Sequence, residues 1–215
     1  SLNRKSEKVC LNTNLRGTLE VLIRKPRTPE VYEDKIADII TQVDRLHSLL
    51  DQLLHIARLD SPETSAKKET VELAAIAGGV VEKLREHAEF KGIAMMLNIP
   101  SDTQVTGDKL YLEVILENLL SNAIKYGKEQ GTTRIEWDAA TRTLTVADDG
   151  TGISAEDLPH IFDRFYRTDK SRSSTVKGNG LGLAIVRKLC QLQHIHISAT
   201  STSGVGTSFM MKFEE

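Results

Sequence analysis

The chain has 215 residues, 40% of them hydrophobic, which is enough for one large domain or two modest ones with buried cores. Its formal charge of -2 gives no bulk electrostatic reason to bind nucleic acid or an anionic membrane, and charged residues interrupt every apolar run well before the roughly 20 residues that a membrane-spanning helix needs. Two widely separated cysteines make no disulfide framework or metal cluster and suit a reducing cytosol. The sequence opens with SLNRK, without Met, so we expect a fragment that lacks upstream modules.

Two helices are expected in the first 60 residues. Between Val31 and Asp60 there is no Gly or Pro, and Thr28 and Pro29 suit the N-cap and the first helical position. The apolar residues of this helix are spaced alternately three and four apart, as in a heptad seam, at Ile36, Ile39, Val43, Leu46, Leu50, Leu53 and Ala57. An earlier helix has its apolar residues at Leu15, Leu19, Leu22 and Ile23. One helical hairpin exposes too much apolar surface to stand alone, so we predict a homodimer that forms a four-helix bundle.

The rest of the chain alternates between helical and strand patterns. A polar linker is expected at 60–69. After it, the patterns predict helices near 73–90, 108–126, 154–160 and 182–193. They also predict strands near 93–98 and 103–106, two more strands within 132–150, and a final hairpin that turns at Ser203 and Gly204. Residues 163–179 show no periodicity. The predicted fold class is α+β: a helical hairpin in residues 1–62, followed by an α/β sandwich in residues 63–215.

The segment ENLLSNAIKYG carries three polar side chains on one helical face. Asn118 and Asn122 are four residues apart and Lys125 follows three later, so all three project from the same side. Carboxamide oxygens can complete a hydrated magnesium shell, and a lysine can meet phosphate charge. A solvated polar face is the alternative explanation.

Two glycine segments follow. In VADDGTGI a strand ends in Asp148, which could accept a hydrogen bond from an exocyclic amine such as that of adenine, and Gly150 and Gly152 permit a tight turn; a simple hairpin turn is the alternative. In KGNGLGLAIVRKL, glycines lead directly into a helix, so backbone N–H groups and the helix dipole could meet an anion; a loop without a ligand is the alternative.

Between these segments lies IFDRFYRTDKSRSSTVK, whose apolar anchors are Phe162, Phe165 and Tyr166. The remaining residues are polar, basic and rich in Ser and Thr, which is typical of a hinged lid. Five basic side chains are available to a triphosphate: Arg164, Arg167, Lys170, Arg172 and Lys177. A basic surface loop would explain any one of them.

In this order, the segments resemble the asparagine box, first glycine box, phenylalanine box and second glycine box of sensor histidine kinases, which share an ATPase superfamily with gyrase, heat-shock chaperones and mismatch-repair proteins. The N-terminal hairpin looks like the dimerisation and phosphotransfer domain of that family. The resemblance implies a cytoplasmic catalytic core that uses ATP and magnesium. Its partner would be a response regulator receiver domain. Only missing upstream segments would anchor it in the inner membrane.

The resemblance also implies a role for each matched position. Asn118 and Asn122 would flank magnesium and phosphates, Asp148 would recognise adenine, and Arg167 would reach the γ-phosphate. The nucleotide pocket would further include Lys125, Tyr126, Gly150, Gly152, Lys177, Gly178, Gly180, Leu181 and Gly182. The second position of DDGTG, often Asn in the family, is Asp149 here, a mild departure that leaves the adenine contact intact.

Phosphoryl transfer is favoured over hydrolysis. Gyrase-like relatives activate water with a Glu four residues before the position of Asn122, and here that position is Asn118. The neighbouring Glu117 faces about 100° away on a helix of 3.6 residues per turn, and a general base must reach the proton that it removes. Transfer with charge held by basic side chains, metal and backbone donors is therefore the expected chemistry.

The acceptor is where the sequence departs from the family. By alignment of LRGTLEVLIRKPRTPE, the acceptor histidine is expected at Ser6, beside the matching acid Glu7. His47 and His55 lie on the second helix and are expected to be ordinary helix-face residues. His194 and His196 are expected on one side of a late strand, with a structural role rather than a metal site.

Two function classes therefore stay open. The first is a histidine kinase core whose acceptor was lost, replaced or deliberately changed. The second is a non-catalytic signalling module that binds nucleotide and docks a response regulator. Transfer of labelled phosphate from ATP distinguishes the two classes.

Overall fold

The computed structural model describes residues 66–168 and 180–214, together with residues 25, 28, 29, 31–37, 39, 40 and 43 near the N-terminus. The chain divides into two compact units, Ser1–Ala57 and Arg58–Glu215. In the first unit, the described residues from Pro29 to Val43 are helical. The Tyr32 amide donates to the Thr28 carbonyl at 3.2 Å, so the helix begins where Thr28 and Pro29 predict. The predicted first helix and the second half of the seam lie outside the described residues.

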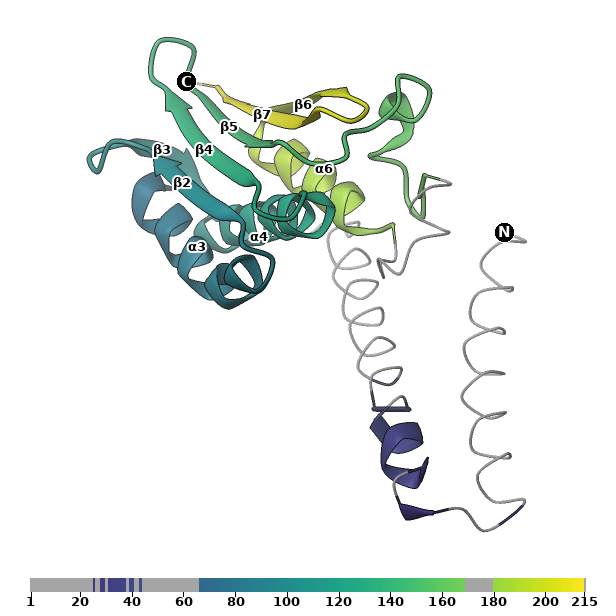
Figure 1. Cartoon of the computed structure of the whole chain (residues 1–215). Coiled ribbons are helices and arrows are strands. Elements are labelled where there is room, and N and C mark those ends of the chain that lie inside the picture. Colours follow the sequence, from purple (N-terminus) through teal and green to yellow (C-terminus); the bar gives the residue numbers. More distant parts are fainter. Residues whose placement is uncertain are drawn as a thin grey trace. The chain divides into compact units, whose positions relative to one another are not determined.

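The second unit has its strands in two sheets (Figure 1). The larger has the order β2-β4-β5-β7-β6, in which β2 is parallel to β4 and the other pairs are antiparallel. The smaller pairs β1 with β3 in antiparallel register. The strand bounds are β1 Glu69–Glu72, β2 Ala94–Asn98, β3 Gln104–Gly107, β4 Thr132–Asp138, β5 Thr143–Asp148, β6 Ile195–Thr202 and β7 Gly206–Phe213.

Three helices cover one face of the five-stranded sheet: α3 Leu73–Phe90, α4 Lys109–Tyr126 and α6 Gly182–Gln193 (Figure 1). Their apolar faces build the core together with side chains from the sheet. Leu116 and Leu189 of the helices and Ile135 and Met211 of the sheet are all at most 1% exposed. Burial of such side chains stabilises the fold by about 1.5–3 kcal/mol each. Within the described ranges, no helix combines the length and apolar character that a membrane crossing requires.

The structure confirms the three long helices and six of the strands, including the final hairpin. β1 was not predicted: Glu69 begins it, at a position assigned to the linker. The predicted helix at 154–160 is wrong, because the structure has only a 3-10 turn at Leu158–His160. The shared strand of His194 and His196 is also wrong, because His194 ends α6 with φ +60° and β6 begins at Ile195.

Candidate functional site

The end of α4 supplies the polar face that the sequence predicts. Asn118, Asn122 and Lys125 are all half-buried there. The Asn118 amide group donates to the Val114 carbonyl at 2.8 Å, so its Oδ1 atom remains available to accept. The Lys125 ammonium lies 5.1 Å from the centre of the Tyr126 ring. This face can therefore offer carboxamide oxygens and a positive charge to the same ligand.

Glu117 does not join that face. Its carboxylate forms an ion pair with Lys83 of α3 at 2.7 Å, and both side chains are largely exposed. The ion pair holds the Glu117 carboxylate on the side of α4 that faces α3. This geometry agrees with the sequence-based expectation that Glu117 points away from Asn118 and Asn122.

The loop after β5 rests on the C-terminal end of α4. The Thr151 amide donates to the Tyr126 carbonyl at 3.1 Å. A Cβ atom at Gly150 would clash with the same carbonyl oxygen, so glycine is needed for this approach. Lys91 fixes the helix end by donating to the carbonyls of Ile124 and Lys125 at 2.9 and 2.8 Å.

Asp148, the last residue of β5, is half-buried between two strands. It stands opposite Thr133 of β4 and opposite Thr207 of β7, so the three residues form a row across the sheet. Burial raises the pKa of the Asp148 carboxyl, while backbone hydrogen bonds from Gly150 and Thr207 oppose the shift. The Gly150 amide donates to Asp148 Oδ1 at 2.9 Å. A carboxylate held in this way presents an acceptor to a ligand amine.

Sequence analysis missed Thr133 and Thr207. Both are buried, and Thr133 Oγ1 has no hydrogen-bond partner within the described part of the chain. In the sequence, these two residues are polar at inward-facing positions of β4 and β7. That pattern alone does not place them beside Asp148, because their alignment depends on the register of the strands. Gly206 was missed as well: a side chain there would clash with the Asp148 carbonyl oxygen.

Asp149 performs a different task from Asp148. Its carboxylate accepts from the Thr132 amide at 3.0 Å and pairs with Lys128 at 3.3 Å. Burial tends to raise the pKa of Asp149, but these partners outweigh it and the pKa is lowered. Asp149 thus fastens the turn that follows α4, which leaves Asp148 as the carboxylate for a ligand.

The second glycine segment meets the phenylalanine segment. Gly180 has φ +65°, and its carbonyl accepts from the Phe165 amide at 2.7 Å. A Cβ atom at Gly180 would be 2.7 Å from the Tyr166 carbonyl oxygen. The positive charge of Arg167 lowers the pKa of Tyr126, against a larger increase from burial, so Arg167 acts electrostatically on the end of α4.

Helix α6 begins directly after this contact. Leu181 is fully buried and, as an apolar residue at the N-cap position, cannot cap the first amides of the helix. A Cβ atom at Gly182 would be only 2.7 Å from Asn118 Oδ1. The structure therefore brings the start of α6, the polar face of α4 and the Asp148 loop together. The second glycine segment and the asparagine segment meet where Gly182 lies against Asn118. Ser6, Glu7, Lys177 and Gly178 lie outside the described residues.

Comparison with known proteins identifies this arrangement. Residues 107–215, half of the chain, match the family described as histidine kinase-, DNA gyrase B-, and HSP90-like ATPase. The chain belongs to this ATPase family. Sensor protein IrlS of Burkholderia pseudomallei is 34% identical over 206 residues, which are 94% of this chain and 43% of IrlS. Within this ATPase family, the chain is similar to sensor proteins such as IrlS, and it spans less than half the length of IrlS.

Two solved structures, ShkA and the histidine kinase ThkA, share the fold of this chain. ShkA, crystallised full-length with AMPPNP, has a TM-score of 0.72 and 27% identity, over 94% of this chain and 43% of ShkA. ThkA, solved in complex with the response regulator protein TrrA, has a TM-score of 0.78 and 22% identity, over 99% of this chain and 60% of ThkA.

Proposed function

We propose that this chain is the catalytic core of a two-component sensor histidine kinase, which binds Mg-ATP for phosphoryl transfer to a histidine and then to a response regulator. The proposal is carried by the contact between Asn118 and Gly182, which joins the polar face of α4 to the start of α6. Asp148 supplies the adenine acceptor at the other end of the site. The segment from Gly180 to Gly182 presents backbone donors to phosphates.

Magnesium fits the donors of this site. Among the described residues, no three His, Cys, Asp or Glu side chains gather to hold a metal ion. Asn118 and Asn122 offer neutral oxygen ligands, which suit a magnesium ion that keeps waters and binds nucleotide phosphates. The ion would neutralise phosphate charge, and Arg167 and Lys125 would add positive charge near the same end of α4.

Transfer rather than hydrolysis follows from the position of Glu117. A hydrolytic site needs a base that reaches the attacking water, and the ion pair of Glu117 with Lys83 turns this acid away from Asn118. The site at Asn118 thus binds ATP, the phosphate donor. The residue that accepts the phosphoryl group lies outside this site.

Calorimetry tests the nucleotide site directly. Titration of the full chain with a non-hydrolysable ATP analogue and magnesium gives a clear isotherm, which Asp148→Ala abolishes because the adenine acceptor is lost. Asp138→Ala is the matched control, since Asp138 is an exposed acid at the end of β4. Equal binding by the Asp148 variant would rule out the adenine assignment.

The acceptor is tested separately. Ser6 occupies the position expected for the histidine, and a serine hydroxyl beside Glu7 is a poorer nucleophile than a neutral imidazole. Incubated with labelled Mg-ATP, the chain stays unlabelled, whereas Ser6→His gains an acid-labile label. Rapid acid-labile labelling of the original chain would show that the alignment is wrong or that His47 or His55 is the acceptor.

The absence of a histidine at position 6 also favours a second candidate function, a non-catalytic module that binds nucleotide and docks a response regulator. If Ser6→His binds the ATP analogue but remains unlabelled, this second function replaces the first. A response regulator receiver domain is the proposed partner in both cases. We also propose that this chain works on the cytoplasmic side of an inner-membrane sensor.

We further propose that residues 1–62 form a homodimeric four-helix bundle, with residues 63–215 as the ATP-binding domain. Ile36 is 49% exposed and Val43 47% exposed in the single chain, on the predicted seam. Light scattering at micromolar concentration reports a dimer, which Ile36→Glu with Val43→Glu converts to monomer. A stable monomer, or dimers that persist after deletion of residues 1–60, would contradict the bundle.

A further inference from the structure

A hydrogen bond between two side chains joins the turn after the first glycine segment to the phenylalanine segment. The Tyr166 hydroxyl donates to Asp157 Oδ1 at 2.6 Å, and both residues are half-buried. This distance is typical of a hydroxyl bound to an ionised carboxylate, a bond about twice as strong as one between neutral groups. Sequence analysis treated Tyr166 as an apolar anchor and so missed its polar end.

The other contacts of Asp157 fix its carboxylate. The Ser154 hydroxyl donates to Asp157 Oδ2 at 2.7 Å, and Ser154 Oγ accepts from the Asp157 amide at 3.1 Å. The turn is also tied to the sheet, because the Ile153 amide donates to Ser201 Oγ of β6 at 2.8 Å. Each oxygen of Asp157 therefore has a hydroxyl donor, and the carboxylate is a fixed acceptor for Tyr166.

The backbone next to Tyr166 is strained. Phe165 has φ +67°, in the left-handed region that is unfavourable for a residue with a Cβ atom. The Phe165 amide donates to the Gly180 carbonyl at 2.7 Å, and the Tyr166 amide donates to the Asp163 carbonyl at 3.2 Å. Such a conformation persists only where the surrounding structure holds it. The bond from Tyr166 to Asp157 adds a side-chain contact to these two backbone bonds.

Arg167 follows this strained turn directly. It is half-buried, and its positive charge lowers the pKa of Tyr126 at the end of α4, against a larger increase from burial. The direction in which the backbone leaves Tyr166 therefore decides whether the guanidinium group reaches the nucleotide site. Release of the Tyr166 hydroxyl lets Phe165 relax to negative φ and turns Arg167 away.

We propose that Asp157 is a positioning residue for Arg167: by holding the Tyr166 hydroxyl, it directs the guanidinium group at the terminal phosphate of ATP. This inference rests on the proposed function, in which Arg167 reaches the γ-phosphate. Because Asp157 acts through Arg167, its effect is confined to the phosphate that ATP has and ADP lacks. The ratio of the affinities for an ATP analogue and for ADP therefore reports it.

Calorimetry of the full chain with magnesium measures both affinities. Tyr166→Phe removes only the hydroxyl oxygen and lowers the affinity for a non-hydrolysable ATP analogue about fivefold, or about 1 kcal/mol, while the ADP affinity is unchanged. Asp157→Ala has the same effect, and Asp157→Asn, which keeps an oxygen for the hydroxyl, has a smaller one. Equal losses for the analogue and ADP would mean general damage to the pocket and overturn the positioning role, as would unchanged affinities.

A double-mutant cycle tests whether the effect passes through Arg167. Arg167→Ala alone lowers the affinity for the analogue more than Tyr166→Phe does. Adding Tyr166→Phe to Arg167→Ala then changes nothing further, because the group that Tyr166 positions is already absent. An additive loss in the double variant would overturn the proposal.

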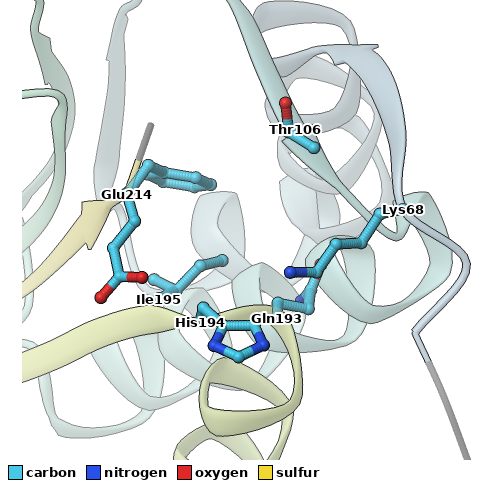
Figure 2. A pocket seen from close by; sticks show the side chains of 7 residues that line it. Lys68, Thr106, Gln193, His194, Ile195 and Glu214 are labelled. Carbon is cyan, nitrogen blue, oxygen red and sulfur yellow. The ribbon is translucent and has the colours of Figure 1, made fainter.

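Tyr111→Phe is the matched control for Tyr166→Phe. It removes the same atom from the first turn of α4, where the Tyr111 amide donates to Asp108 Oδ1 at 3.2 Å. Gln193, which lines the pocket in Figure 2, accepts from the Asp108 amide at this same end of the helix. Since α4 spans 18 residues, or about 27 Å, this end is remote from Asn122. Tyr111→Phe should keep both affinities, and a loss confined to the analogue would contradict the proposal.

Asp163→Asn is the matched control for the Asp157 variants. It removes an exposed carboxylate from the phenylalanine segment, where Asp163 Oδ2 lies 3.2 Å from His160 Nδ1. The carbonyl that accepts from the Tyr166 amide is kept. Both nucleotide affinities should stay at the parent values. A fivefold loss for the analogue would show that any acid of this segment has the effect and would contradict the role of Asp157.

Failure of the proposed function has a different signature. If the parent chain binds neither nucleotide, or if Arg167→Ala leaves the affinity for the analogue unchanged, the assignment of the site is wrong and the positioning role is overturned with it. If Arg167→Ala loses affinity for the analogue and Tyr166→Phe does not, only the positioning role is overturned.

Discussion

Gly182, the first residue of α6, lies so close to Asn118 of α4 that a Cβ atom at position 182 would be 2.7 Å from Asn118 Oδ1. The two residues are far apart in sequence and belong to different motifs. Their contact means that the second glycine segment and the asparagine segment are parts of one surface. Glycine is therefore needed at position 182 if the Asn118 oxygen is to keep its place.

Gly182→Ala is expected to weaken binding of the Mg-ATP analogue about tenfold, or about 1.4 kcal/mol. The added methyl group displaces the end of a flexible side chain, so Asn118 rotates while the fold is kept. Calorimetry measures the affinity, and fluorescence of Trp137, the single tryptophan, follows thermal unfolding of the ATP-binding unit.

Gly79→Ala is the matched control for Gly182→Ala. Gly79 is in the middle of α3 with nothing within 4 Å of an added Cβ atom. The change should stabilise the helix by about 0.5–1 kcal/mol without altering nucleotide affinity. Unchanged affinity in Gly182→Ala would contradict the role assigned to the contact with Asn118.

Gly152 and Gly204 form a second informative pair. Both have positive φ, +63° and +81°, which costs a non-glycine residue about 1–2 kcal/mol. A Cβ atom at Gly152 would also clash with the Thr202 carbonyl, while one at Gly204 meets nothing within 4 Å. Gly152→Ala should therefore lose about 3 kcal/mol or more, and Gly204→Ala about 1–2 kcal/mol, in urea unfolding followed by Trp137. Equal losses would show that the Thr202 contact relaxes freely.

Long periodic segments were predictable from the sequence because burial alone determines their pattern. The helices at Leu73–Phe90 and Gly182–Gln193 follow directly from apolar spacing. β1 was not predictable in this way, since Val71 is its single buried residue and the neighbouring residues are polar. Its pairing with β3 supplies the backbone partners that local pattern cannot reveal.

The site was predictable only as far as motifs lie within one segment. The shared face of Asn118 and Asn122 follows from helical spacing. The row of Thr133, Asp148 and Thr207 depends on the register of three strands, which no local pattern gives. The bond from the Asp108 amide to Gln193 joins residues 85 positions apart, so tertiary packing alone creates it.

Cys190 should be unreactive in the folded protein. It is fully buried in α6, and desolvation raises its pKa from 9.0 to about 12. The thiolate fraction at pH 8 is then about a thousandfold below that of an ordinary cysteine. In a Cys10→Ser variant, a thiol reagent should find no reactive group in the native state and one after denaturation. Rapid native labelling would mean that α6 opens readily.

Asp148→Asn and Asp138→Asn should change the pH dependence of stability in opposite directions. The pKa of Asp148 is raised by burial, so the folded state disfavours its charge: the penalty is absent below the ordinary pKa of 3.8 and complete above the raised value. The pKa of exposed Asp138 is lowered by its hydrogen bonds to Thr141 and Ala140, so its charged form stabilises the fold, and that stability is lost as pH falls through the lowered value. Urea unfolding without nucleotide, followed by Trp137 at pH 3 and pH 7, measures both effects. Relative to the parent chain, Asp148→Asn should gain free energy of unfolding as pH rises and Asp138→Asn should lose it; the same sign for both would contradict the opposite environments of these two carboxylates.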